Sequence, residues 1–227
     1  MPDYVNPPPP VTVLPVQGFD RLFAVRRVFC VGRNYAAHAR EMGADDREPP
    51  FFFTKPRDAV VPPGGAVPYP SATADLHHEV ELVVALGGGG ADVPVEAAGA
   101  LVFGHAVGVD LTRRDLQAAA KAKGQPWDAA KGFDASAPVG AIRPAAAGAS
   151  PSGRIRLSVN GALRQDSDLA DMIWSVPEII AQASRLWRLE PGDLIFTGTP
   201  EGVAALSRGD VVRGEADGVG EVAFTVR

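Results

Sequence analysis

Two glutamates lie two residues apart in one of the most apolar stretches of the chain. The stretch reads ADLHHEVELVVALGGGG over residues 74–90, and Glu79 and Glu81 alternate there with apolar residues. Side chains two apart on a β-strand project from the same face, so the two carboxylates are expected to project together. They could face water on a half-exposed strand. They could also be buried around a divalent cation, because a bare buried carboxylate pair would be costly.

A third carboxylate favours the cation. Asp110 ends the apolar run VFGHAVGVD, which reads as another strand. Three oxygen donors without a cysteine are typical of a hard ion such as Mg²⁺ or Mn²⁺. By alternation, His77 shares the face of Glu79 and Glu81 and is a candidate neighbour or ligand, whereas His78 faces the other way.

A histidine and a glutamate could supply acid–base chemistry near this site. His38 and Glu41 lie three apart in NYAAHAREMG, residues 34–43, which is expected to be a helix. A histidine oriented by a carboxylate is suited to removing a proton from water. On spacing alone, an exposed surface pair is the favoured interpretation.

Cationic side chains and one loop are candidates for binding an anionic substrate. Lys131 stands among small residues in DAAKGFDAS, where it could neutralise an anionic intermediate. Arg114 and Gln117 share a helix face by their i,i+3 spacing, and Arg113 lies on a different part of that helix. The loop TGTPEG, residues 197–202, offers two hydroxyls and backbone amides suited to a carboxylate.

The elements that must position these residues are mostly strands. Glycine and proline are abundant, which indicates short elements and many turns. We expect strands over 25–31, 49–56, 76–86, 99–109 and 209–227, a hairpin over 153–165 with Asn160-Gly161 as its turn, and helices over 112–124 and 175–190. Residues 6–10 favour an extended polyproline-type arm. The fold class expected is α+β, mostly β, in one domain.

Composition limits the class of protein. The chain has 227 residues, 46% of them hydrophobic, and a net charge of −5 with no basic run, which argues against nucleic acid as a partner. No apolar stretch approaches the ~20 residues that cross a bilayer. The first residues lack the layout of a secretory signal. One cysteine, Cys30, fits a reducing cytoplasm and is expected to be a buried thiol.

A series of motifs resembles one known family. The motifs occur between Arg27 and the end of the chain, in the same order as in that family. They are CVGRNYAAHAREMG, FFFTKP, DLHHEVELVVALG, GVDLTRRDLQ, KGQPWDAAKGFDASAP, VNGALRQ, MIWSVPEIIAQAS and PGDLIFTGTPEGV. The chain therefore resembles the fumarylacetoacetate hydrolase superfamily, in its short single-domain acylpyruvase branch. The long apparent match at 30–56 and the proline-rich start are similar to the bacterial subgroup that acts on 3-fumarylpyruvate.

The resemblance implies a fold and a set of site residues. It implies a β-roll or sandwich with short helices and a lid helix, as one catalytic domain over 25–227 after an irregular arm over 1–24. It implies a homodimer whose metal, Mg²⁺ or Mn²⁺, is held by Glu79, Glu81 and Asp110. It also implies that His38 and Glu41 form a water-activating dyad. Further residues match the family's substrate pocket: Arg33, Lys55, Arg114, Gln117, Lys131 and Thr199.

The reaction implied is hydrolysis of a C–C bond in a 2,4-diketo acid. The metal and Lys131 would stabilise the pyruvate enolate that forms when the bond breaks. The narrower expectation is hydrolysis of 3-fumarylpyruvate to fumarate and pyruvate in gentisate degradation, with Arg113 or Arg164 as candidates for the second carboxylate. Oxaloacetate decarboxylation and keto–enol tautomerisation remain alternatives because they use the same enolate. A further alternative is that the protein is a non-catalytic metal-binding module.

Overall fold

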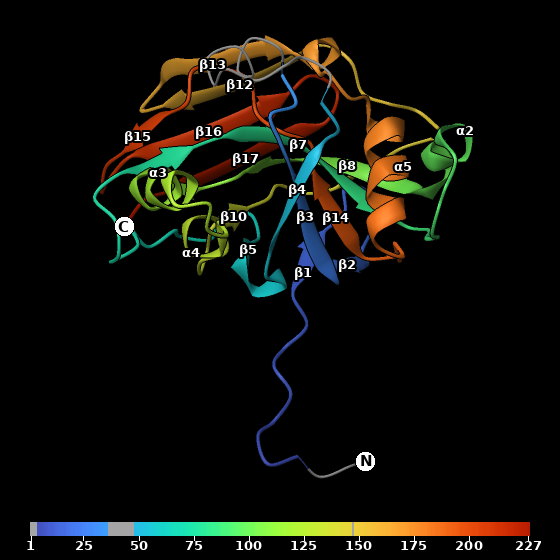
Figure 1. The fold of residues 1–227 in the computed structure, drawn as a ribbon, viewed down its shortest axis with the longest axis horizontal. Coiled ribbons are helices and arrows are strands. Elements are labelled where there is room, and N and C mark those ends of the chain that lie inside the picture. Colours follow the sequence, from blue (N-terminus) through green and yellow to red (C-terminus); the bar gives the residue numbers. More distant parts are fainter. Residues whose placement is uncertain (1–3, 36–47, 147) are drawn as a thin grey trace.

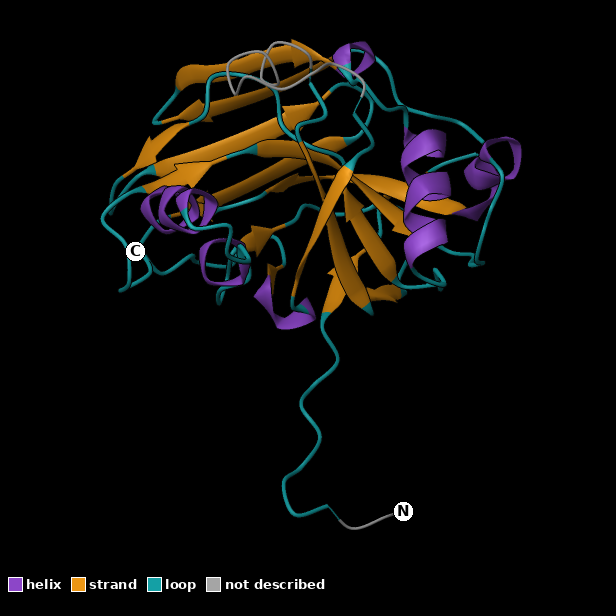
Figure 2. Ribbon diagram, viewed as in Figure 1, coloured by secondary structure: helices purple, strands orange, loops and turns teal. Residues whose placement is uncertain are grey.

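Two β-sheets packed face to face form the body of the protein. The computed structural model describes residues 4–35, 48–146 and 148–227. Figure 1 shows the two sheets crossing the molecule, and Figure 2 shows that the helices are short and lie around them. The expectation of a mostly β fold with short helices is confirmed.

The larger sheet has six strands and carries most of the expected core. Its order is β11 (Arg143–Pro144), β8 (Val102–Val109), β7 (Val80–Leu86), β14 (Asp193–Phe196), β3 (Arg27–Gly32) and β4 (Phe51–Lys55). All neighbours are antiparallel except β14 and β3, which run parallel. The central strands β7, β8 and β14 are mostly apolar and almost entirely buried, because both faces of this sheet are covered.

The second sheet has four strands and supplies the facing layer. Its order is β13 (Ala162–Asp168), β12 (Arg154–Val159), β16 (Val211–Ala216) and β17 (Gly220–Thr225). Asn160 and Gly161 both have positive φ, at 52° and 79°, between β12 and β13. This is the backbone of a type I′ turn, so the expected hairpin is confirmed.

Small sheets and helices complete the body. The sheets pair β1 (Val13–Pro15) with β2 (Leu22–Ala24), β5 (Val60–Val61) with β10 (Ala137–Pro138), and β6 (Leu76–His78) with both β15 (Ala204–Leu206) and β9 (Thr112–Arg113). The helices are α2 (Val95–Ala98), α3 (Arg114–Ala122), α4 (Asp128–Lys131) and α5 (Val176–Leu186), with 3-10 turns at Arg57–Ala59, Gly99–Leu101 and Leu169–Asp171. None of the helices in the described ranges has the length and hydrophobicity needed to span a bilayer.

Strand β7 separates two apolar clusters. Val80, Leu82 and Val84 pack into the cluster between the two sheets. Val83 and Ala85 pack on the opposite face, against residues of β3 and β14. Every residue of β7 is buried, as expected for a strand covered on both sides. Glu81 belongs to the face of Val83 and Ala85, and is therefore in the interior.

The irregular arm is shorter than expected. The expectation was an irregular segment over 1–24, but β1 and β2 pair within it, Leu14 is fully buried, and Val16 bridges to Ile142. Three-residue strands carry too little periodicity to be found from sequence. Residues 4–11 are the exposed part, and we call them the arm; Figure 1 shows it leaving the body below β1.

The expected lid helix, with His38 and Glu41, lies outside the described residues. Of the expected range 34–43, only Asn34 and Tyr35 are described; neither is helical, and Tyr35 forms a β-bridge with Met172. The Asn34 side chain is buried; its Nδ2 donates to the carbonyls of Trp174 and Thr197, and its Oδ1 accepts from the Trp174 amide. The end of β3 is thereby tied to the loop that follows β14.

Candidate active site

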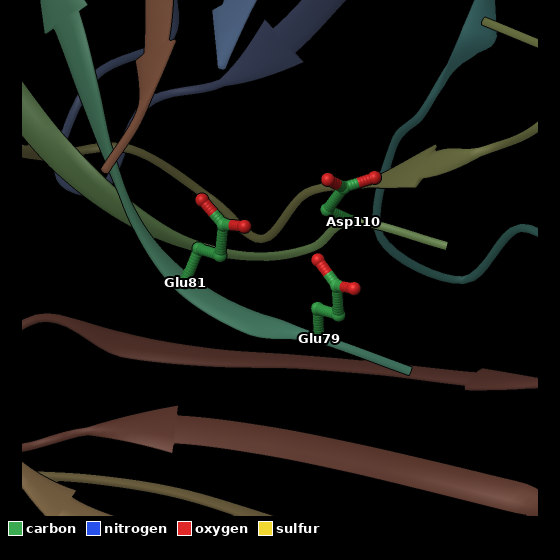
Figure 3. A group of neighbouring side chains, drawn as sticks. All are labelled: Glu79, Glu81 and Asp110. Carbon is green, nitrogen blue, oxygen red and sulfur yellow. The ribbon is translucent and has the colours of Figure 1, made fainter. Parts of the chain in front are cut away.

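The three predicted carboxylates meet in the interior. Glu79 precedes β7, Glu81 lies on it, and Asp110 directly follows β8. The pairing of Val80 with Val109 and the hydrogen bond from the Asp110 amide to the Glu79 carbonyl place them side by side. All three are buried, and one carboxylate oxygen of each lies within 4.8 Å of the others. Figure 3 shows the three side chains converging on a common space.

Lys131 is the main cationic partner of this cluster. Its Nζ lies 2.8 Å from Glu79 Oε2 and 2.6 Å from Asp110 Oδ2, and it donates to Thr112 Oγ1. Burial alone would lower the pKa of Lys131, but Asp110 and Glu79 outweigh it and raise that pKa above its ordinary value. The lysine is therefore charged in the folded protein.

Two further cations each contact one carboxylate. Arg114 Nη2 lies 2.5 Å from Glu79 Oε1, and Lys55 Nζ lies 2.8 Å from Asp110 Oδ1. Burial disfavours the ionised form of Glu79, yet Lys131 and Arg114 hold its pKa well below the usual range. Lys55 also donates to the carbonyls of Leu111 and Lys131, which fixes it behind Asp110.

Glu81 differs from its two neighbours. Its Oε2 accepts the Gly198 amide at 2.6 Å, and within the described ranges it makes no ion pair. Burial first, and then the charges of Asp110 and Glu79, raise the pKa of Glu81 well above its usual value. The cluster is thus short of positive charge at Glu81.

This donor set fits a hard divalent cation. Carboxylate oxygens are the ligands that Mg²⁺ and Mn²⁺ prefer, and no softer donor takes part in the cluster. A cation beside Glu81 would also relieve the repulsion that raises its pKa. Glu79, Glu81 and Asp110 are therefore the residues that would hold the metal.

Most of the expected substrate residues line one pocket above the carboxylates. The pocket is lined by predicted site residues and by apolar and aromatic side chains: Val31, Gly32, Arg33, Phe53, Glu79, Glu81, Arg114, Gln117, Trp127, Lys131 and Thr199. Trp127 contacts Phe53, with ring centroids 6.0 Å apart, and forms an aromatic wall that sequence reasoning missed. Its loop position gave no periodic signal.

Other expected contacts are not formed. Lys55 does not line the pocket, because it is buried against Asp110. Arg113 donates to the Ala129 carbonyl and lies over the Phe133 ring, while Arg164 is exposed on β13, so neither lines the pocket. The expectation for His77 is wrong: it contacts Asp75 and not the acidic cluster, because β6 joins a different sheet from β7.

Gln165 is a buried residue that connects the pocket to the metal-ligand strand. Its Nε2 donates to Thr199 Oγ1 at 2.8 Å and to the Pro200 carbonyl at 2.9 Å. Its Oε1 accepts the amide of Val80, the residue between the two glutamates, and lies 3.0 Å from His78 Nδ1. Because Thr199 Oγ1 accepts this bond, its own proton is free for a partner in the pocket. Gln165 therefore positions Thr199.

Comparison with known proteins agrees with this geometry. The fold and the buried acidic site are those of a metal-dependent enzyme. Residues 27–227 match the family model for the fumarylacetoacetate (FAA) hydrolase C-terminal domain, and the chain belongs to this family. The resemblance seen in the sequence is confirmed.

Individual relatives carry two different names. The structure of fumarylpyruvate hydrolase from Pseudomonas aeruginosa, solved with Mn²⁺ and pyruvate, is 51% identical, with a TM-score of 0.95 over 99% of each chain. Fumarylpyruvate hydrolase from a Ralstonia species is 44% identical over 79% of this chain and 93% of its own. The mitochondrial oxaloacetate tautomerase of Rattus norvegicus is 45% identical over 88% of this chain and 91% of its own.

Glu81→Gln separates metal binding from folding. The substitution keeps an acceptor for the Gly198 amide but removes one of three crowded charges, so we expect Mn²⁺ affinity to fall at least tenfold, roughly. The metal-free protein should be at least as thermally stable as the parent, because repulsion from Asp110 and Glu79 is gone. Calorimetric titration with Mn²⁺ and thermal melting in EDTA measure the two effects. A large loss of metal-free stability would contradict the electrostatic account.

Gln165→Met tests the positioning of Thr199. The methionine matches the glutamine in size but donates no hydrogen bond, so the Thr199 hydroxyl loses its fixed orientation. We expect KM for a diketo acid to rise roughly tenfold, with kcat changed less. The control is Gln182→Met, at a half-buried position on α5. Equal KM values in the two variants, with both folded, would remove Gln165 from this role.

Proposed function

We propose that this protein hydrolyses acylpyruvates, with 3-fumarylpyruvate as its substrate and fumarate and pyruvate as products. The observation that carries the proposal is the buried cluster of Glu79, Glu81 and Asp110 beneath a pocket of cationic and hydroxyl groups. A relative of the same fold, 51% identical, was solved with Mn²⁺ and pyruvate, and pyruvate is one of the two products proposed here.

We propose that the metal and the pocket residues bind different groups of the substrate. Mn²⁺ or Mg²⁺ held by Glu79, Glu81 and Asp110 would supply Lewis-acid polarisation of substrate oxygens. We propose that Arg114, Gln117 and Thr199 donate hydrogen bonds to the carboxylate and keto oxygens at the pyruvate end.

Arg33 is available for another part of the substrate. Among the residues that the structure describes, Arg33 makes no ion pair, and its buried Nε has no hydrogen-bond acceptor. We propose that it contacts the acyl part of the substrate, whose second carboxylate needs a cation. Lys55 acts indirectly, by holding Asp110.

The chemical step needs water and a proton acceptor. We propose that His38, oriented by Glu41, removes a proton from water; this rests on the sequence, since both residues lie outside the described ranges. The hydroxide adds to the distal ketone, and the C–C bond then breaks with its electron pair left on the pyruvate side. Lys131, which is charged and buried, stabilises the negative charge that develops there. Protonation of that carbon completes the release of pyruvate and fumarate.

The setting of the reaction is proposed on sequence and family grounds. We propose a homodimer acting in the cytoplasm on a product of gentisate degradation, without nucleic acid or membrane partners. The net charge of −5 and the single cysteine, which is buried, support this setting.

A second candidate function is oxaloacetate tautomerisation, with decarboxylation as a variant. The identity of 45% to the rat mitochondrial oxaloacetate tautomerase favours including it. The same metal ligands and Lys131 would serve, because the two reactions share an enolate. Tautomerisation and decarboxylation differ from hydrolysis in that neither needs attack by water.

Metal removal and a substrate panel test the proposal directly. We expect EDTA to abolish hydrolysis and Mn²⁺ or Mg²⁺ to restore it. With metal present, kcat/KM for 3-fumarylpyruvate should exceed that for acetylpyruvate and for oxaloacetate, each by roughly tenfold or more. Loss of substrate is followed by the absorbance of the enolised diketo acid. A folded, metal-loaded protein that acts on none of the three would support the non-catalytic module instead.

His38→Ala distinguishes hydrolysis from tautomerisation. Removing a general base should lower kcat for hydrolysis by roughly 10²–10⁴-fold. Oxaloacetate tautomerisation, measured on the same preparation, should keep much of its rate, since it needs no hydroxide. Glu41→Gln is the companion variant and should show a smaller loss in hydrolysis alone. Hydrolysis that survives in His38→Ala would exclude the proposed dyad.

A further inference from the structure

The arm is apolar and stands away from the body that carries it. Residues 4–11 read YVNPPPPV, contain no charge and are all exposed, with Val5 fully so. The four consecutive prolines at 7–10 favour an extended polyproline helix of about 12 Å, and the chain bends before them at Val5 and Asn6. Figure 2 shows this segment as a loop that projects from the body. Such a segment has apolar side chains and no surface of its own chain to cover them.

An apolar pocket lies at the root of the arm. It has a volume of about 450 Å³, and its walls come from the β1–β2 hairpin, from the β7 end and from β8, with Phe19, Leu22, Phe23, Leu86, Phe103 and Pro191 as the main apolar lining. Phe23 and Phe103 stack with centroids 5.6 Å apart. Leu22 is 61% exposed at its mouth. None of its lining residues belongs to the pocket above the acidic cluster.

We propose that the arm of one copy of this chain binds in the apolar pocket of a second copy. The chain's own pocket is hard to reach: the Thr12 carbonyl accepts the Val25 amide, which fixes the root of the arm on the hairpin. Proline at 7–10 locks φ and resists the reversal that docking on the same chain would need. The point where the arm leaves the body, at Thr12, and the pocket both belong to the β1–β2 hairpin. A two-fold pairing of copies would therefore let the arm of each copy reach the pocket of its partner.

The chemistry of the two surfaces matches. Proline-rich segments in the polyproline conformation bind grooves lined with aromatic side chains, and little ordering entropy is lost because the segment is already extended. The uncharged arm meets a lining with one cation, Arg21.

The comparison with the Pseudomonas aeruginosa structure adds support. The superposition covers 99% of this chain, whereas residues 1–11 make up about 5% of it, so most of the arm has a counterpart there. An extended segment without support from its own body that has a counterpart in a solved relative is best held by a neighbouring copy.

Site-directed cross-linking tests the proposal on the full chain. Cys30 is the one native cysteine and is buried, so introduced cysteines react alone. Val5→Cys and Leu22→Cys variants are mixed and treated with a short bis-maleimide. We expect a two-chain product whose linked peptides contain positions 5 and 22. The matched control pairs Val5→Cys with Leu163→Cys, at a 57% exposed leucine on β13, and should give none.

Two outcomes would overturn the proposal. A chain carrying both Val5→Cys and Leu22→Cys that cross-links only within itself would show that the arm docks on its own pocket. Absence of any link between positions 5 and 22 would show that the pocket is not its site. As a second readout, Leu22→Asp should raise the dissociation constant of the dimer at least tenfold in sedimentation equilibrium, whereas Leu163→Asp should not. This test is independent of catalysis, so its failure leaves the proposed function unaffected.

Discussion

Repulsion among three buried carboxylates is the constraint on which the site depends. At separations up to 4.8 Å, each pair of charges repels by at least roughly 3.5 kcal/mol at an effective dielectric of about 20. Three cationic side chains offset this repulsion: Lys131, Lys55 and Arg114 each form an ion pair with Glu79, Asp110 or both. That arrangement explains why Lys55 and Lys131 are buried, whereas the other two lysines of the chain, Lys121 and Lys123, are exposed. It also leaves Glu81 for the metal to neutralise.

Backbone geometry makes this arrangement possible. The β7–β8 register aligns Glu79 with Asp110, and the loop after β14 aims the Gly198 amide at Glu81. Gly198 has φ of 96°, which disfavours other residues, and a Cβ there would lie 2.7 Å from that of Asn34. Asn34 in turn holds the same loop through the Thr197 carbonyl. The carboxylate that lacks a cation is therefore held by backbone hydrogen bonding.

The sequence predicted what is local and missed what is distant. The two-residue spacing of Glu79 and Glu81, with Asp110 at a strand end, was enough to propose the acidic site. Periodicity also located most strands and the Asn160-Gly161 turn.

Three other features depend on contacts that spacing does not encode. Gln165 is 85 residues from Val80, whose amide it accepts, and Lys55 is 56 from Leu111, so their roles follow only from the folded chain. His77 was misplaced because strand alternation was extended across Glu79, where the chain passes from one sheet to another.

The two activities named for the relatives make a common demand on the site proposed here. In the mechanism proposed above, a metal at Glu79, Glu81 and Asp110 together with Lys131 stabilises the enolate, and this requirement is common to hydrolysis and tautomerisation. On this proposal, the choice between the reactions comes from pocket groups away from the carboxylates, which would place water or the acyl group. Arg33 is such a group: it has φ of 62°, an uncommon conformation for a residue with a side chain, at the end of β3. The Arg33 guanidinium thereby lines the pocket, and Arg33 lies just before the segment that carries His38 and Glu41.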